Sequence, residues 1–123
     1  MTETRNAPVT EWVRRIKAVR LPVVIYGAAV VGEVLHQACM EAGTAVECFC
    51  DNNINKTRAP LRGLKVIHTP TLKTAFPEAV VLISAADIKD AVDQLTALGM
   101  NRWYSASVLL RDCDVNRHVF SAP

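Results

Sequence analysis

An apolar strand that runs directly into a glycine turn and a helix constrains the fold of this chain more than any other feature of its sequence. Residues 21–26 (LPVVIY) are almost continuously apolar, as strands buried on both faces of a parallel sheet are. The turn at 27–32 (GAAVVG) opens a helix whose apolar stripe ends before Gly43, a residue suited to a helix C-terminus. A second strand at 45–50 stops before Asp51. The segment predicts a strand–helix–strand unit of a parallel sheet.

Three further strands are predicted in alternation with helices. They lie at 65–68, 79–84 and 102–105, with a short helix opened by Thr69 and Pro70 and a longer one capped by Asp87. The chain order and the glycine turn after the first strand favour the spatial order 3-2-1-4-5. The sequence therefore predicts a three-layer, Rossmann-like α/β fold with a five-stranded parallel sheet. Its ligand crevice would lie where the strand order reverses, at the carboxyl ends of the first and fourth strands, and would be surrounded by residues 27–32, 51–53 and 84–87.

The length of the chain indicates one domain. Its 123 residues, 50% of them hydrophobic, suffice for one core but not for a cofactor domain joined to a substrate domain. Residues 1–8 predict a loose N-terminus, and a single Rossmann-like domain is expected over 9–123. That domain would begin with an amphipathic helix at about 10–20 and end with a helix at about 107–120.

Composition narrows the possible functions and partners. The 14 Lys and Arg residues against 12 Asp and Glu residues give a net charge of +2, too small to favour nucleic-acid binding. No apolar run reaches the roughly 18 residues of a membrane span and no secretory signal is recognisable, so we expect a cytoplasmic protein. The 4 cysteines follow no metal or disulfide spacing and are expected to be reduced thiols; they are Cys39, Cys48, Cys50 and Cys113.

The glycine turn matches two of the three glycines in the dinucleotide-binding fingerprint G-x-G-x-x-G. Gly27 and Gly32 occupy the first and third positions, and Asp51 follows at the end of the next strand. Free amides at the start of the helix would bind an anion, and the Asp51 carboxylate would bind a ribose diol rather than a 2′-phosphate. The middle position is Ala29, whose methyl group would crowd a pyrophosphate. The alternative is that both glycines serve only the packing of the helix on the sheet.

The candidate ligand-binding residues gather around this crevice. They belong to the glycine turn, the segment after the second strand and the end of the fourth strand. These residues are Gly27, Ala28, Ala29, Val31, Gly32, Asp51, Asn52, Asn53, Lys56, Ser84 and Ala85. A loop with basic residues at 56, 58, 62 and 65 either closes over the crevice to meet phosphates or is a solvated connection.

The remaining reactive residue types predict no catalytic or metal centre. Cys48 and Cys50 alternate on one strand, so they share a face and are expected to be buried core residues. His36 and His68 have no partner fixed by spacing and are expected to be surface histidines. No spacing typical of metal ligands recurs.

Several segments together resemble one family of domains. The segments VVIYGAAVVGEVL, VECFCDNNINK, GLKVIHTPTL and AVVLISA are similar to the small Rossmann-like domain of bacterial polysaccharide-biosynthesis proteins, over about 22–106. Such domains precede the catalytic parts of sugar acyltransferases, nucleotide-sugar dehydratases and some sugar methyltransferases and glycosyltransferases. The DNNxxK segment, from Asp51 to Lys56, is the most specific part. The resemblance implies binding of NAD(P) or a nucleotide-sugar, with Gly27 and Gly32 at the phosphates and Asp51 at the ribose.

Three functions follow as alternatives. The first is a nucleotide-binding domain, not catalytic by itself, that presents NAD or a nucleotide-sugar to a catalytic domain or partner protein in glycan biosynthesis. The second is a structural or oligomerisation module with a vestigial pocket, a homodimer for example, which associates through Trp12 or the apolar tail at Val119 and Phe120. The third is an NAD-dependent enzyme completed across an oligomer interface. Neither Tyr26 nor Tyr104 begins the Tyr-x-x-x-Lys pair with which short-chain dehydrogenases move a proton.

Overall fold

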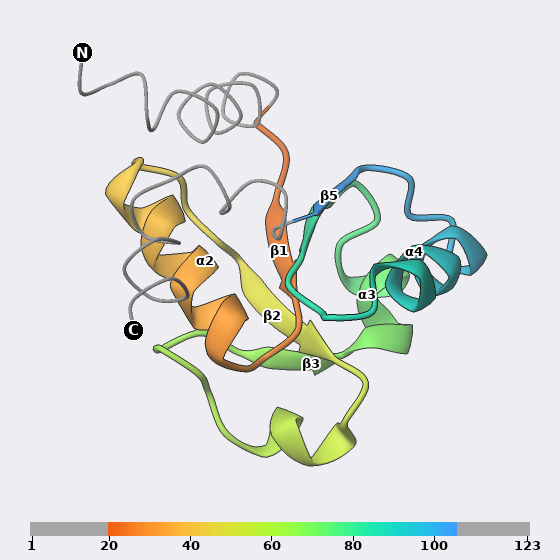
Figure 1. Cartoon of the computed structure of the whole chain (residues 1–123), viewed down its shortest axis with the longest axis horizontal. Coiled ribbons are helices and arrows are strands. Elements are labelled where there is room, and N and C mark those ends of the chain that lie inside the picture. The colour runs from red at the N-terminus through yellow and green to blue at the C-terminus, as the bar shows by residue number, and fades with distance from the viewer. Residues whose placement is uncertain (1–19, 106–123) are drawn as a thin grey trace.

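A parallel sheet forms the centre of the computed structural model, which describes residues 20–105 (Figure 1). Its strands are β1 (Val23–Tyr26), β2 (Cys48–Asp51), β3 (Val66–His68), β4 (Val80–Ile83) and β5 (Trp103–Ser105). Neighbouring strands run parallel in the order β3-β2-β1-β4-β5. This confirms the α/β fold and the strand order that the sequence predicts.

Helices cover both faces of the sheet. One face carries α2 (Val30–Glu41), and the other carries α3 (Leu72–Ala75) and α4 (Ile88–Ala97), as Figure 1 shows. Two short 3₁₀ helices, η1 (Ile54–Arg58) and η2 (Thr69–Thr71), lie on either side of β3 along the chain. None of the helices in the described residues has the length and apolarity needed to cross a membrane.

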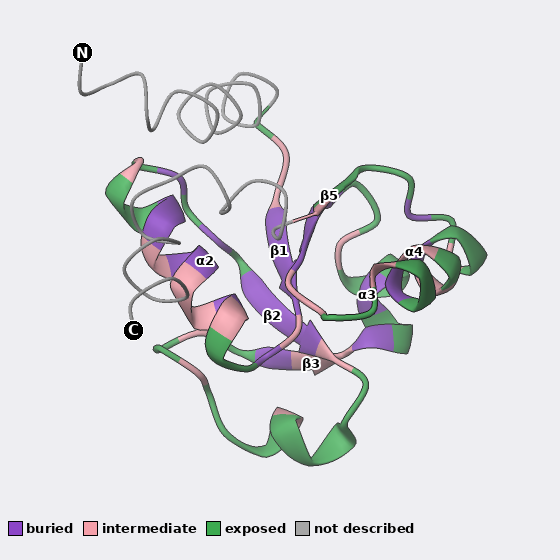
Figure 2. Ribbon diagram, in the orientation of Figure 1, coloured by how far each residue is buried: buried purple, intermediate pink, exposed green. Residues whose placement is uncertain are grey.

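The two faces of the sheet supply two separate layers of core. In β1, Val23 and Ile25 pack towards α2, while Val24 and Tyr26 pack towards α4, because successive side chains of a strand point to opposite faces. All residues of β1 and β4 are buried, as Figure 2 shows for these central strands. Burial on both faces explains why both strands are continuously apolar in sequence.

The helix ends follow the sequence signals. Asp87 is the N-cap of α4, and its side chain accepts a hydrogen bond of 3.1 Å from the backbone N–H of Asp90. Gly43 and Gly99 follow the C-terminal ends of α2 and α4 with positive φ angles of 78° and 79°. Glycine adopts this left-handed conformation without the strain that a Cβ would add.

Element boundaries differ from those expected. The strands β1, β3, β4 and β5 are each shorter than predicted by one or two residues. β2 begins at Cys48 rather than at residue 45, and it includes Asp51 as its last residue. Thr69 does not cap a helix: it lies within η2, and its side chain is buried. The loose start at 1–8, the helix at about 107–120 and, except for Arg20, the helix at about 10–20 lie outside the described residues, as do Trp12, Cys113, Val119 and Phe120.

Candidate functional site

A cavity of about 510 Å³ opens at the carboxyl ends of β1 and β4, between the first turns of α2 and α4. This is the point at which the strand order reverses, where ligands of open α/β sheets bind. The volume lies within the range of small-molecule sites, about 300 to 1,000 Å³. Eight of the predicted site residues line it: Gly27, Ala29, Val31, Gly32, Asp51, Asn52, Ser84 and Ala85.

Five further residues line the cavity that the sequence reasoning did not assign to a ligand. Tyr26 is the last residue of β1, Val30 begins α2, and Ala86, Asp87 and Asp90 lie where β4 leads into α4. Val30, Ala86 and Asp87 lie within the ranges expected to surround the crevice, whereas Asp90 lies beyond them in the first turn of α4. Tyr26 gave no such signal, since it reads as a core residue of a buried strand.

The two glycines of the turn are required by packing. Gly27 has a φ of 109°, and a Cβ at this position would lie 2.5 Å from the Ser84 hydroxyl oxygen. A Cβ on Gly32 would overlap the carbonyl oxygen of Gly27. Because neither residue has a Cβ, α2 can begin directly against the end of β1. This brings the first backbone amides of α2 to the cavity wall.

The first turn of α2 presents backbone amides without a side-chain cap. The N-cap residue is Ala29, which has an extended backbone and no side chain that can accept a hydrogen bond. The first amides of a helix have no intrahelical acceptor, so those of Val31 and Gly32 are available at the cavity. Together with the helix dipole they make this turn an electropositive part of the wall.

Asp51 holds the glycine turn as well as facing the cavity. Its Oδ2 accepts a hydrogen bond of 2.9 Å from the backbone N–H of Ala28, and its Oδ1 accepts one of 2.8 Å from the N–H of Asn53. A carboxylate has about four acceptor positions, so each oxygen retains capacity for a further donor. The side chain can therefore accept hydrogen bonds from ligand hydroxyl groups without releasing the turn.

Three predicted contacts lie outside the cavity. The Nζ of Lys56 donates a hydrogen bond of 2.9 Å to the carbonyl oxygen of Ala28, and both residues line a separate hollow of about 250 Å³. The side chain of Asn53 caps η1 by accepting a hydrogen bond of 3.0 Å from the N–H of Asn55. These residues shape the glycine turn and its flank rather than the cavity wall.

Asn52 belongs to a closed side-chain network at the cavity wall. Its Nδ2 donates to Tyr26 Oη at 3.1 Å and to Gln94 Oε1 at 3.0 Å, and its Oδ1 accepts from Gln94 Nε2 at 2.8 Å. Tyr26 in turn donates to Gln94 Oε1 at 2.7 Å. Burial raises the pKa of the Tyr26 phenol, so the hydroxyl stays protonated as the network requires. The network ties the end of β2 to α4.

The basic loop does not reach the cavity. None of its residues Lys56, Arg58, Arg62 and Lys65 lines the wall. Arg62 contacts α2 instead: its Nε donates to His36 Nδ1 at 2.8 Å, and a terminal nitrogen donates to Gln37 Oε1 at 2.6 Å. In this structure the loop is a connection fastened to the helix.

The expectation of a surface histidine is wrong for His36. Its side chain is buried at 6% exposure and meets the ring of Phe49 edge-on, with centroids 5.7 Å apart. Burial, followed by the positive charge of Arg62, lowers the pKa of the imidazole. A neutral ring is needed here, because Nδ1 accepts the Arg62 hydrogen bond. His68 is half-buried, and its Nε2 lies 3.2 Å from the carbonyl oxygen of Asn52.

The cysteines of the described residues are core residues. Cys39, Cys48 and Cys50 are free thiols and buried, as expected for the strand pair Cys48 and Cys50. Burial raises the pKa of Cys39 and Cys50 to about 12 and that of Cys48 to about 11, so these thiols are poor nucleophiles. Within the described residues, no group of His, Cys, Asp and Glu side chains is arranged to hold a metal ion.

The fold and the cavity define a class of molecule: a three-layer α/β domain with an open cavity at the point where the strand order reverses. Comparison with known proteins finds no matching family model, no similar curated protein and no matching solved structure. The functional conclusion therefore depends on the chemistry of the cavity.

Proposed function

We propose that the cavity binds a nucleotide, NAD or a nucleotide-sugar, and that the domain presents this ligand to a catalytic domain or partner protein of glycan biosynthesis without catalysing a reaction by itself. The observation that carries the proposal is the pairing of two complementary surfaces in one cavity. The first turn of α2 offers uncapped amides, and Asp51 offers carboxylate oxygens at the end of the neighbouring strand. Phosphates suit the first surface and a ribose diol suits the second.

The absence of catalysis is part of the proposal. The Tyr26 hydroxyl is already engaged with Gln94, and the thiols of Cys48 and Cys50 are buried in the sheet away from the cavity lining. A positioned acid or base must reach the reacting group with its proton free to move. The side chains at this wall suit binding better than proton transfer.

Titration of the purified full chain with NAD, UDP-glucose and ADP by isothermal calorimetry tests the proposal. We expect saturable binding of at least one nucleotide, and loss of that binding in Asp51→Ala. Because Asp51 also supports the turn, a second variant is needed: Ala29→Gly removes the methyl group beside the phosphate position and should strengthen binding. Glu41→Gln, which is exposed at the far end of α2, is the control. Absence of binding by every nucleotide would refute the proposal.

A second candidate is a structural or oligomerisation module with a vestigial pocket. It is favoured by one observation: Gly27 and Gly32 are required for packing whether or not a ligand binds. Light scattering at several protein concentrations separates the two candidates. A homodimer that binds no nucleotide supports the module, and a nucleotide-binding monomer contradicts it.

A further inference from the structure

The side chains that line the cavity offer free acceptors but no free donors among the residues described. Tyr26 donates to Gln94, and Asn52 donates to Tyr26 and Gln94. Ser84 donates to the carbonyl oxygen of Tyr26 at 2.7 Å. No Lys, Arg or His side chain from residues 20–105 lines the wall. The donors left for a ligand are therefore the backbone amides in the first turn of α2.

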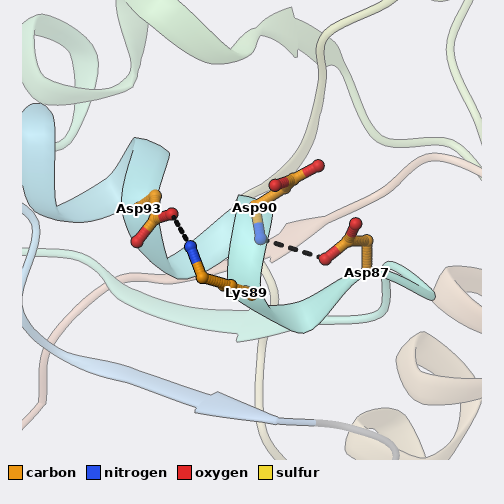
Figure 3. A network of polar contacts seen from close by, with 4 residues as sticks. All are labelled: Asp87, Lys89, Asp90 and Asp93. Carbon is orange, nitrogen blue, oxygen red and sulfur yellow. Dashed lines mark hydrogen bonds and ion pairs between the residues drawn. The ribbon is translucent and has the colours of Figure 1, made fainter.

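The side-chain acceptors with remaining capacity are carboxylates at two places on the wall, although Asp51 and Asp87 each also accept backbone hydrogen bonds. Asp51 lies at the end of β2, whereas Asp87 and Asp90 lie at the start of α4. Lys89 lies between Asp87 and Asp90 in sequence. Figure 3 shows that its side chain is directed to Asp93, with which it forms an ion pair of 2.9 Å. The hydrogen bond and the negative charge of Asp87 raise the pKa of Asp90 and outweigh the opposite effect of Lys89, as expected for two neighbouring carboxylates.

The sheet places Asp51, the amides of α2 and the carboxylates of α4 in this spatial order along the crevice. The strands lie in the order β2, β1, β4, so the first turn of α2, which follows β1, stands between Asp51 and the start of α4. An extended nucleotide with its ribose at Asp51 and its phosphates at α2 must place its far end beside Asp87 and Asp90. That far end would meet carboxylates rather than donors.

We propose that the cavity selects nucleotides whose far end, beyond the phosphates, carries a positive charge, and rejects those with a negative charge there. The inference rests on the proposed function. Oxidised nicotinamide dinucleotide, with its cationic ring, has this chemistry. A nucleotide-sugar with a carboxylate on the sugar has the opposite chemistry.

Comparison of NAD⁺ with NADH on the full chain tests this selectivity. The two ligands share both riboses and the diphosphate, and they differ in the nicotinamide ring, which is charged only in NAD⁺. We expect NAD⁺ to bind about fivefold more tightly at low ionic strength, as a single contact between opposite charges near a surface allows. The ratio should fall towards one in high salt, because the carboxylates are exposed.

Variants connect the selectivity to the two carboxylates. Asp87→Asn combined with Asp90→Asn should abolish the preference for NAD⁺, and asparagine keeps the N-cap of α4. Asp93→Asn is the matched control, because it removes one negative charge from the same helix at a residue that does not line the cavity. The preference should persist in this control.

The outcomes separate the two proposals. ADP and UDP lack the far end, so their binding tests the nucleotide site alone. If these and NAD⁺ all fail to bind, the proposed function itself is refuted. If ADP or UDP binds but NAD⁺ is no tighter than NADH, or the double variant keeps the preference, the charge selectivity is overturned while nucleotide binding stands.

Discussion

The carboxylate of Asp51 accepts a 2.9 Å hydrogen bond from the backbone N–H of Ala28 and so joins the end of β2 to the turn that follows β1. The residue that the sequence assigns to a ribose thus already has a structural partner. A ligand diol would be added to this contact, since the carboxylate has further acceptor positions. If the proposed ligand binds here, its binding would be coupled to the shape of the glycine turn through this one side chain.

Replacing Asp51 by asparagine should destabilise the domain. An amide group places an N–H beside one of the two backbone donors, Ala28 or Asn53, and leaves that donor without an acceptor. We expect a loss of about 1–3 kcal/mol in the free energy of unfolding, measured with urea. Asp93→Asn, whose partner Lys89 is exposed, should cost less than about 1 kcal/mol. Equal stability of the two variants would contradict the assignment.

Substitution of Gly32 by alanine should be more damaging than substitution of Gly63. The Cβ at position 32 would overlap the Gly27 carbonyl oxygen, whereas a Cβ at position 63 meets nothing within 4 Å. We expect Gly32→Ala to cost about 3 kcal/mol, because backbone must move. Gly63→Ala should cost about 1 kcal/mol from its φ of 80° alone. Chemical denaturation of both variants provides the comparison, and similar costs would argue against close packing at Gly32.

The network of Tyr26, Asn52 and Gln94 should show energetic coupling across the cavity wall. Tyr26→Phe removes the donor to Gln94 Oε1 and should lower the unfolding free energy by about 1 kcal/mol. A double-mutant cycle of Tyr26→Phe with Gln94→Ala should give a coupling of at least about 0.5 kcal/mol. Additive effects of the two substitutions would show that the hydrogen bond contributes nothing measurable.

The stability of the domain should fall as the pH falls below the ordinary pKa of histidine. The pKa of His36 is lowered in the folded state from 6.5, by burial and then by Arg62, so the unfolded chain takes up the proton first. The contribution of His36 to the free energy of unfolding is therefore fully present above about pH 6.5. It is lost as the pH falls towards the folded-state pKa. Urea unfolding of the native chain and of His36→Asn at about pH 7.5 and about pH 5.5 measures this. The variant should show the smaller decrease, and an equal decrease would exclude His36 as the cause.

The buried thiols should resist alkylation while the domain is folded. With the pKa values of Cys39 and Cys50 raised to about 12 and that of Cys48 raised to about 11, almost no thiolate is present at neutral pH. Iodoacetamide labelling followed by peptide mapping should find these three positions unmodified in buffer and modified in urea. Rapid labelling of any of them in buffer would show that its strand or helix opens.

The course of the chain through the sheet follows from local patterns. Continuous apolar runs at β1 and β4 predict strands buried on both faces, and the glycine turn predicts the position of the crevice. The crevice residues of the turn, Asp51 and the end of β4 could be named for the same reason. The strand boundaries did not follow from these patterns: β2 includes Asp51 because its pairing with β3 extends to His68.

The hydrogen-bond partner of each polar side chain could not be predicted from local sequence patterns. Asn52 is bonded to Gln94, 42 residues away, and Arg62 is bonded to His36, 26 residues away. Sequence spacing says nothing about such partners, since they come from elements that meet only when the sheet and its helices have packed. Lys56 is a further example, because its Nζ donates to the carbonyl oxygen of Ala28 in the glycine turn and does not line the cavity.

The sequence by itself determined the α/β architecture, the strand order and the place of the crevice, because burial periodicity, glycine positions and the handedness of crossovers are local rules. Only the tertiary structure decided which groups remain free to meet a ligand. It satisfied the donors of Tyr26, Asn52 and Ser84 internally and left the carboxylates of Asp87 and Asp90 at the wall. The physical reason is that hydrogen bonds between distant elements satisfy many polar groups. The polar groups that remain without such partners determine the chemistry of the cavity.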